Sequence, residues 1–149
     1  MIRQISFKTK FSWISAYAKK DKIIKVKFAK SKNKFVNKNL KIFEKNLKNF
    51  FSGKNKIIKS KINMNGSIIQ KKIWEELRKI KFGKTKSYGE IAKKYKLSPR
   101  YVGKICGQNK IPLIIPCHRV IKSNGNIGGF SARAGISLKK KLLDFEKNY

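Results

Sequence analysis

Apolar and polar residues alternate along two stretches near the start of the chain. In residues 24–28 apolar side chains alternate with lysines, and residues 11–17 show a similar alternation. A period of two is typical of a strand that buries one face. Residues 57–64 are predicted as a further strand. The first part of the chain is therefore expected to contain a small sheet.

A helical repeat lies between these predicted strands. Its apolar positions recur every three or four residues, with lysine and asparagine on the other face, and they are Leu40, Phe43, Leu47 and Phe50. Gly53 is a suitable stop for this helix. We therefore predict that residues 1–65 form a small α/β domain, and no pattern in it indicates catalytic chemistry.

The pattern changes after residue 65, where helical signals dominate. An amphipathic helix is indicated by a stripe of apolar residues, namely Ile69, Ile73, Leu77 and Ile80. Ser87 and Glu90 fit a capping box at the start of a second, short helix. Ser98 and Pro99 suit the N-cap and first position of a third. Two short helices joined by a tight turn form a helix-turn-helix, so residues 66–149 are predicted as a mostly helical domain containing one.

The composition adds a strong positive charge to this picture. Lysine and arginine number 39 against 7 acidic residues, a net charge of +32, while 40% of the residues are hydrophobic. That apolar content is enough to bury a core, and the charge excludes an acidic surface and favours polyanionic partners. Since lysine, isoleucine and asparagine share AT-rich codons, base-composition drift explains the lysine content about as well as selection for nucleic-acid affinity.

Other classes of protein are disfavoured by what the sequence lacks. It has no continuous apolar run of membrane length and no apolar segment typical of an export signal. Two cysteines, Cys106 and Cys117, do not make a disulfide scaffold, and a single histidine cannot build a zinc site. We therefore expect a cytoplasmic protein without a metal site and without a membrane partner.

Residues 114–121 carry the strongest chemical signal. Pro116 interrupts an apolar run, and Cys117, His118 and Arg119 follow it directly. A thiol must lose its proton to act as a nucleophile, and the sole histidine is the only side chain that normally titrates near neutral pH. Because adjacent side chains on a strand point to opposite faces, the pair could cooperate only on a bent backbone or through a water. The alternative is a buried structural cysteine beside a satisfied core histidine.

This stretch and its flanks resemble a known family. Residues 116–120 read Pro-Cys-His-Arg-Val, the hallmark of the methylated-DNA–protein-cysteine methyltransferases, also called O6-alkylguanine-DNA alkyltransferases. Further segments match family motifs, and these are residues 87–92, residues 100–103, Asn109, residues 128–131 and residues 142–146. The detailed resemblance covers residues 66–146, whereas residues 1–65 resemble the family's variable α/β domain only loosely.

The resemblance implies a catalytic role for four residues. Cys117 is expected to take the alkyl group from guanine O6, and His118 to accept the thiol proton through a water. Glu146 is expected to orient His118, and Asn109 to brace the helix-turn-helix against the active-site loop. Lys110 follows Asn109 where proline is usual, which predicts a looser brace.

The resemblance also implies a set of contacts to double-stranded DNA. Tyr88 is expected to help rotate the damaged nucleotide out and to donate to the base, and Arg100 to fill the gap left in the stack. The Val120 carbonyl and Ser131 are expected in the guanine pocket, and Arg119 is counted among the DNA or base contacts. Physical reasoning agrees that a stacked base must be extruded, that a wedge offsets its cost, and that the leaving base needs a donor.

A sequence typical of a tight turn lies between Cys117 and Ser131. Residues 123–125 read Ser-Asn-Gly, and the Asn-Gly pair favours a tight turn between Ile121 and Ile127. A hairpin at this point would bring Ser131 back toward Cys117.

The predicted function is therefore DNA repair by irreversible, stoichiometric transfer of an alkyl group from O6-alkylguanine to Cys117. O4-alkylthymine is included by the resemblance. Because each molecule is expected to act once, no cofactor is expected, and the protein is expected to be a monomer. One alternative is an alkyltransferase-like protein that binds lesions without repairing them, but such relatives lack the reactive cysteine. The other is a basic structural or RNA-binding protein, which only the composition favours.

Overall fold

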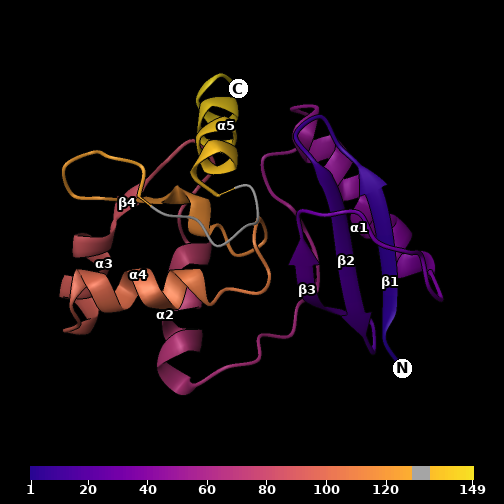
Figure 1. Cartoon of the computed structure of the whole chain (residues 1–149), viewed down its shortest axis with the longest axis horizontal. Helices are drawn as coiled ribbons and strands as arrows, with labels where there is room; N and C mark the ends of the chain where they lie inside the picture. The colour runs from indigo at the N-terminus through magenta and orange to yellow at the C-terminus, as the bar shows by residue number, and fades with distance from the viewer. Residues whose placement is uncertain (129–134) are drawn as a thin grey trace. The chain divides into compact units, whose positions relative to one another are not determined.

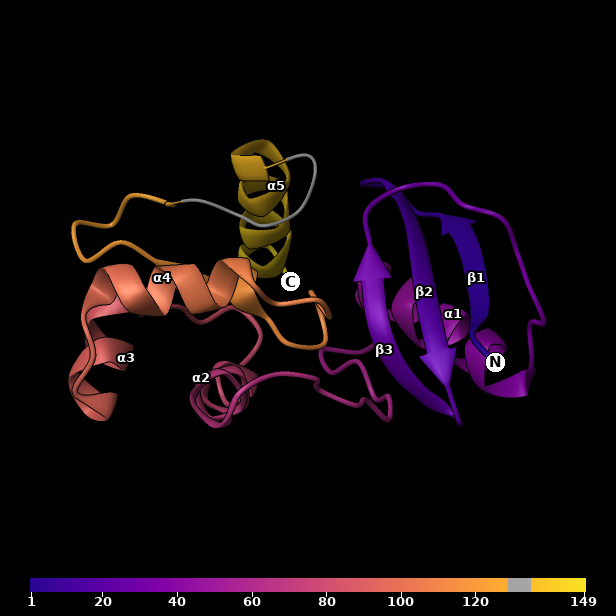
Figure 2. The ribbon, with the colours of Figure 1, turned by 60° about the horizontal axis from the view of Figure 1, so that its bottom comes forward.

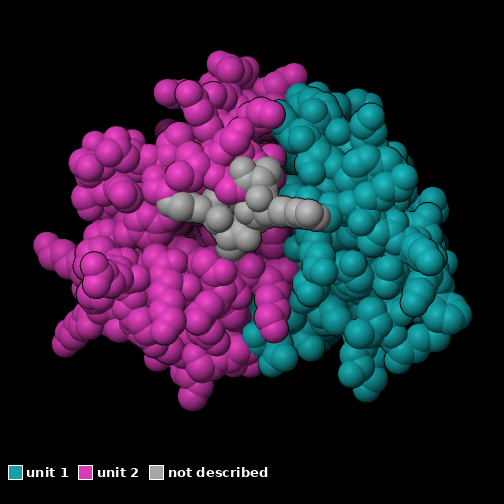
Figure 3. All heavy atoms as spheres, in the orientation of Figure 1, with its two compact units in different colours: residues 1–65 teal, residues 66–149 magenta. Residues whose placement is uncertain are grey.

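The chain divides into two compact units, Met1–Asn65 and Gly66–Tyr149, which Figure 3 distinguishes by colour. This computed structural model describes residues 1–128 and 135–149. The elements follow the order β1 (Arg3–Lys8), β2 (Trp13–Lys19), β3 (Lys22–Lys27), α1 (Lys38–Phe51), α2 (Ile68–Arg78), β4 (Lys86–Ser87), α3 (Tyr88–Tyr95), α4 (Pro99–Gly107), η1 (Cys117–Arg119), β5 (Val120–Ile121) and α5 (Gly135–Lys147). Among the described residues, the helices are too short or too polar to cross a bilayer.

The first unit consists of an antiparallel sheet in the order β1-β2-β3, with α1 lying across one face (Figure 1 and Figure 2). Asn37 caps α1 by accepting from the Leu40 backbone N–H. The apolar face of the helix is buried, and the Phe43 ring meets the Phe7 ring of β1 edge to face at 6.3 Å. The predicted small sheet with a helix is therefore confirmed.

Two details of this unit differ from the sequence prediction. Strand β1 was not predicted, because the alternation around Ile5 and Phe7 spans only two apolar positions. The strand predicted at residues 57–64 is wrong, since the structure has only an isolated bridge there between Ile62 and Ile23. Ile57 is 71% exposed, so this segment does not alternate between a buried and a solvent face.

Helices α2, α3 and α4 begin at local capping signals. Ser87 caps α3 by accepting from the Glu90 N–H, which is one half of the predicted capping box, and Ser98 caps α4 with Pro99 in its first turn, as predicted. Lys96 ends α3 in the left-handed conformation, and α3 and α4 pack against each other. Helix α2 starts with a capping box that the sequence analysis did not identify.

The segment after Cys117 leads into a short parallel sheet. Strand β5 pairs with β4, with Val120 opposite Lys86. The tight turn predicted after Ile121 is present, since Gly125 has a φ of +86° and the Lys122 N–H donates to the Asn126 carbonyl at 2.8 Å. The prediction of a strand hairpin is wrong for the described residues, because the partner of β5 is β4 and not a returning strand.

Candidate active site

Cys117 begins a single turn of 3-10 helix that directly follows Pro116. Its backbone N–H donates to the Ile115 carbonyl at 2.8 Å, and the Arg119 N–H donates to the Pro116 carbonyl at 3.0 Å. The backbone is therefore bent at this point, which is one of the two arrangements in which Cys117 and His118 could cooperate. Cys117 is 3% exposed and is not in a disulfide.

The imidazole of His118 is completely buried and faces a carboxylate. Its Nε2 lies 2.6 Å from Oε2 of Glu146. Burial lowers the pKa of His118 although Glu146 acts in the opposite direction. Burial alone would raise the pKa of Glu146, but His118 and Arg119 outweigh it and bring this pKa to about 2. The neutral imidazole therefore donates its Nε2–H to an ionised carboxylate.

This tautomer leaves a basic nitrogen on the other side of the ring. When Nε2 of His118 carries the proton, Nδ1 carries a lone pair. Nδ1 is buried and has no hydrogen-bond partner among the described residues. Nδ1 is therefore the atom of this ring that can accept a proton.

Arg119 completes the surroundings of Glu146. Its Nε donates to Oε1 at 2.8 Å and its Nη2 to Oε2 at 3.0 Å, while Nη1 donates to the Ile80 carbonyl at 2.7 Å. The Gly83 N–H also donates to Oε1 at 3.2 Å. The guanidinium is thus turned inward and Arg119 is only 7% exposed, so in this structure its partner is Glu146, and its contact with DNA stays a prediction. Arg119 therefore fixes the position of the Glu146 carboxylate, and that carboxylate is hydrogen-bonded to His118.

Asn109 connects α4 to the segment that carries the cysteine. Its Nδ2 donates to the Ile115 carbonyl at 2.9 Å, and its Oδ1 accepts from the Ile111 N–H at 2.9 Å. The side chain is buried just after the end of α4. This geometry fits a brace between α4 and the loop before Cys117.

Cys117 lines a cavity of about 590 Å³. Its walls are Tyr88, Pro99, Arg100, Gly103, Cys106, Gly107, Cys117, Lys122, Ser123 and Gly128. Three site residues that the resemblance predicted in separate segments of the chain, Tyr88, Arg100 and Cys117, thus border one space. Ser131, the remaining predicted pocket residue, lies outside the described residues, as does most of the motif at residues 128–131.

Tyr88 presents a protonated phenol to this cavity. It is the first residue of α3, and its hydroxyl accepts from Nζ of Lys139 at 3.3 Å. Burial raises the pKa of Tyr88 to about 12, and negative charge on Cys106 and Cys117 acts in the same direction. The hydroxyl therefore keeps its proton at neutral pH and can donate it to a ligand.

Lys139 is a site residue that the sequence analysis missed. It is fully buried on α5, and Nζ donates to the Val120 carbonyl as well as to Tyr88. Burial lowers the pKa of Lys139 to about 8, although attraction to Cys117 acts in the opposite direction. The Val120 carbonyl, a predicted guanine contact, is therefore already engaged by an ammonium group. Lys139 follows Leu138 on the buried face of α5, but one lysine among so many gave no distinct signal.

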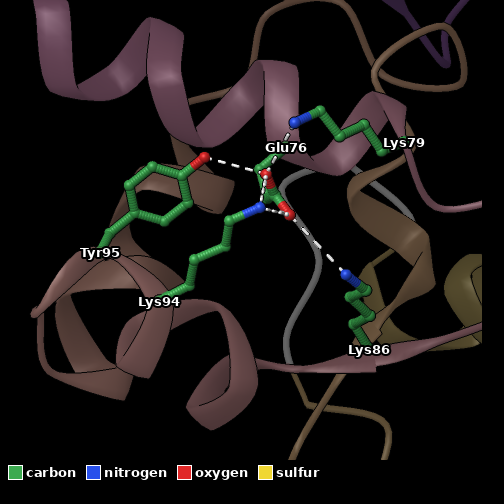
Figure 4. Close-up of polar contacts among 5 residues, drawn as sticks. All are labelled: Glu76, Lys79, Lys86, Lys94 and Tyr95. Carbon is green, nitrogen blue, oxygen red and sulfur yellow. Dashed lines mark hydrogen bonds and ion pairs between the residues drawn. The ribbon is translucent and has the colours of Figure 1, made fainter.

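A second buried carboxylate organises the helices beside the cavity (Figure 4). Glu76 of α2 accepts from the Tyr95 hydroxyl at 2.9 Å, from Lys94 at 3.0 Å and from Lys79 at 3.3 Å, and Lys86 lies 3.7 Å away. Burial would raise the pKa of Glu76, but the hydrogen bonds from Lys94, Tyr95 and Lys79 lower it to about 2. Glu76 thereby connects α2 to α3 and β4.

Helix α2 is also connected to α4. The Trp74 indole N–H donates to the Ile105 carbonyl at 3.0 Å, and Gln70 donates to Gln108 at 2.7 Å. Both α3 and α4 are therefore hydrogen-bonded to α2. Within the described ranges, no group of three potential metal-ligating side chains is present.

Comparison with known proteins decides the family. Residues 68–148 match the family described as 6-O-methylguanine DNA methyltransferase, DNA binding domain. The chain belongs to this family. A methylated-DNA–protein-cysteine methyltransferase of Methanocaldococcus vulcanius is 51% identical over 84 residues, which are 56% of this chain and 50% of that protein. The corresponding protein of Metallosphaera sedula is 36% identical over 149 residues, 98% of this chain and 94% of its own length.

Solved structures extend the family similarity to both units. The O6-methylguanine methyltransferase of Mycobacterium tuberculosis has a TM-score of 0.87 and 25% identity, covering 99% of this chain and 94% of that one. A structure of the M. tuberculosis protein in complex with DNA has a TM-score of 0.86 at the same identity, covering 97% and 92%. The family predicted from residues 116–120 and their flanks is confirmed.

Proposed function

We propose that this protein repairs DNA by transferring an alkyl group from O6 of guanine in a duplex to its own Cys117, once per molecule. The observation that carries the proposal is a cysteine on the wall of a base-sized cavity, followed in sequence by an imidazole that is hydrogen-bonded to an ionised, buried carboxylate. Similarity to methyltransferases that act on methylated DNA supports the same reaction.

The proton of the Cys117 thiol passes, through a water, to Nδ1 of His118. Glu146 holds the tautomer that makes Nδ1 basic and stabilises the imidazolium that forms. The thiolate then attacks the alkyl carbon, a carbon–sulfur bond forms, and the carbon–O6 bond breaks. The guanine leaves as an anion that takes up a proton, and the thioether on Cys117 has no return path.

Two further side chains support the charge changes in this step. Attraction between the Cys117 thiolate and Lys139 raises the pKa of the lysine, and by reciprocity the same attraction favours the thiolate. Negative charge develops on the leaving base, where a positioned donor lowers the barrier. The Tyr88 hydroxyl, held by Lys139 at the cavity wall, is suited to be that donor.

The base must leave the helical stack before it reaches Cys117, which costs a few kcal/mol. Arg100 is exposed at the start of α4 and borders the cavity, so its side chain can enter the gap that the flipped nucleotide leaves. In this proposal α3 and α4 act as the helix-turn-helix, and the net charge of +32 attracts the phosphates. O4-alkylthymine, which carries a similar alkyl ether, is a second substrate.

Intact-protein mass spectrometry with peptide mapping tests the proposal. After incubation with a duplex that contains O6-methylguanine, we expect one added methyl group per molecule, located on Cys117. An unmethylated duplex serves as the control and should add nothing. If Cys117→Ala still acquires the methyl group, or if the methyl maps to another residue, the proposal is wrong.

A further inference from the structure

The first unit, residues 1–65, carries a strong positive charge that the alkyl-transfer site does not use. It contains 19 lysine and arginine residues against two acidic ones, Asp21 and Glu44. All residues that line the cavity beside Cys117 belong to the second unit. Because base-composition drift accounts for the lysine content about as well as selection does, the side chains beside the lysines must show what this charge can bind.

Aromatic side chains lie on the face of the sheet that is turned away from α1. Ile14 of β2 pairs with Phe7, whose ring contacts α1, so both lie on the covered face. Residues 13, 15 and 17 alternate with Ile14 and lie on the opposite face, which we call the outer face. A solvated sheet face is usually polar, yet Trp13 and Tyr17 are half-buried there. Drift toward AT-rich codons does not explain Trp13, because the tryptophan codon is rich in guanine.

Ammonium groups border both aromatic rings. Nζ of Lys30 lies 4.8 Å from the centre of the Trp13 ring. Nζ of Lys25 and Nζ of Lys27 lie 5.9 Å and 5.8 Å from the centre of the Tyr17 ring. These distances are within the range of cation–π attraction. No acidic residue is among the strand residues of the outer face, which are Gln4, Ser6, Lys8, Trp13, Ser15, Tyr17, Lys25 and Lys27.

The segment that carries Lys30 is fixed to the outer face by serine hydroxyls. Ser15 is completely buried between the two rings along β2, and its Oγ donates to the Ala29 carbonyl at 2.6 Å. The Ser31 hydroxyl donates to Oγ of Ser15 at 2.8 Å. Because the residues on both sides of Lys30 are hydrogen-bonded to the sheet, the fold itself places this lysine beside Trp13.

A ring bordered by ammonium groups suits an unpaired nucleotide, because the base stacks on the ring and the phosphates attract the ammonium groups. In a duplex, neighbouring pairs already cover both faces of each base. We propose that the outer face binds single-stranded DNA, with Trp13 and Tyr17 stacking on unpaired bases. DNA is favoured as the polymer because residues 68–148 match a DNA-binding family model. The inference is independent of the proposed function, since this face shares no residue with the cavity.

Tryptophan fluorescence of the full-length protein tests this proposal. The chain has two tryptophans, and Trp74 is buried with its indole N–H bonded to the Ile105 carbonyl. Stacking of a thymine on Trp13 should therefore quench the emission of Trp13 when oligothymidylate is added. The same strand paired with oligodeoxyadenylate should quench little. Trp13→Phe keeps a ring but removes the reporter, so the quench should disappear in this variant.

The affinity obtained from this quench tests the second ring. Tyr17→Leu should weaken the affinity about fivefold or more, the effect of losing one stacked base. Phe35→Leu is the matched control, because Phe35 is an exposed aromatic residue of the same unit that lies outside the outer face. Its affinity should stay that of the wild type.

A pair of double variants tests the lysines. Lys27→Gln/Lys30→Gln should weaken binding and reduce its dependence on salt, because two ammonium groups near the phosphates are lost. Lys38→Gln/Lys45→Gln removes the same charge from exposed positions of α1 and should bind as the wild type does.

The proposal is wrong if oligothymidylate does not quench the wild type, if the duplex quenches it equally, or if the quench survives in Trp13→Phe. It is also wrong if the α1 double variant loses as much affinity as the outer-face double variant, since diffuse attraction would then be sufficient. Tighter binding of the matching oligouridylate would make RNA the ligand, against this proposal. If Tyr17→Leu fails to fold, as its melting curve would show, the lysine variants decide. Methyl transfer to Cys117 is measured separately, so its failure would contradict only the proposed function.

Discussion

Two buried carboxylates in the second unit have similarly low pKa values but very different partners. Both Glu146 and Glu76 have a pKa of about 2, and both are at most 3% exposed. The partners of Glu146 are the buried side chains of His118 and Arg119. The partners of Glu76 include three lysines whose side chains are 43% to 66% exposed.

Under the proposed function, this difference in partners separates a chemical role for Glu146 from a structural one for Glu76. Buried partners cannot exchange with water, so they hold one proton arrangement on His118. Exposed lysines are screened by solvent and can replace one another, so they hold α3 and β4 near α2 without fixing the state of any single group. Of the seven acidic residues, one thus fixes the hydrogen bonding of a buried histidine and another joins elements of the fold.

The largest effect is expected for Glu146→Gln. The amide cannot enforce the tautomer with a basic Nδ1, and it leaves the Arg119 guanidinium buried without its counter-charge. The single-turnover rate of methyl transfer should fall about 100-fold or more. Losing one partner of a buried ion pair should also lower the free energy of unfolding by about 3 to 5 kcal/mol. A rate within threefold of wild type would remove the distinction between the two carboxylates.

Lys139→Met should lower the transfer rate about 10- to 100-fold, because the donor to Tyr88 and the charge beside Cys117 are lost. The free energy of unfolding of this variant should, in contrast, increase. The pKa of Lys139 is about 8 in the folded protein, against an ordinary value of 10.5 for a lysine in water, so between these values the unfolded chain binds more protons. Wild-type stability should therefore rise with pH across this window.

Denaturant unfolding at several pH values from neutral to alkaline checks this prediction. Lys139→Met lacks the titrating amine, so the rise in stability above pH 8 should disappear in the variant. A wild type whose stability does not increase in this window would contradict the assignment of a depressed pKa to a buried lysine.

Glu76→Gln should affect stability more than chemistry. It weakens the hydrogen bonds from Lys94, Tyr95 and Lys79, and because the lysines are exposed the expected loss is about 1 kcal/mol. Transfer at saturating DNA should stay within twofold of wild type. A loss of rate as large as that of Glu146→Gln would show that α3 cannot be displaced without disabling the nucleophile.

Lowering the pH should make the difference between Glu146 and Glu76 clearer. The folded-state pKa of each carboxylate is about 2 and its ordinary value is 4.5, so its stabilising contribution is present above pH 4.5 and is lost as the pH falls toward 2. Both variants should therefore show a shallower acid loss of stability than wild type. The change should be greater for Glu146→Gln, whose partners are buried.

The smallest effect is expected for Lys94→Gln. Tyr95, Lys79 and Lys86 remain around Glu76 when Lys94 is neutralised (Figure 4). Its melting temperature should fall by less than that of Glu76→Gln. An equal or larger fall would mean that one exposed lysine, and not the whole cluster, carries the connection between α2 and α3.

Short-range signals in the sequence were sufficient for the elements around the site. The Ser98-Pro99 start of α4 and the serine cap of α3 depend on neighbouring residues alone, so they could be predicted. The motif at residues 116–120 is also a local signal, and it indicated the family. The strand expected at residues 57–64 failed because the segment forms only one isolated bridge, between Ile62 and Ile23, and leaves Ile57 exposed.

The sequence by itself determined the family and led to the proposal of Cys117 as the nucleophile with His118 beside it, because the motif lies in five consecutive residues. Only the tertiary structure decided that Arg119 turns inward and is hydrogen-bonded to Glu146. The same holds for the hydrogen bonds from Lys139 to Tyr88 and Val120, and for the ion pairs of Glu76 with three lysines. The physical reason is that the role of a charged side chain depends on which opposite charge burial brings within hydrogen-bond reach. In a chain with 39 basic residues, sequence alone cannot say which of them that will be.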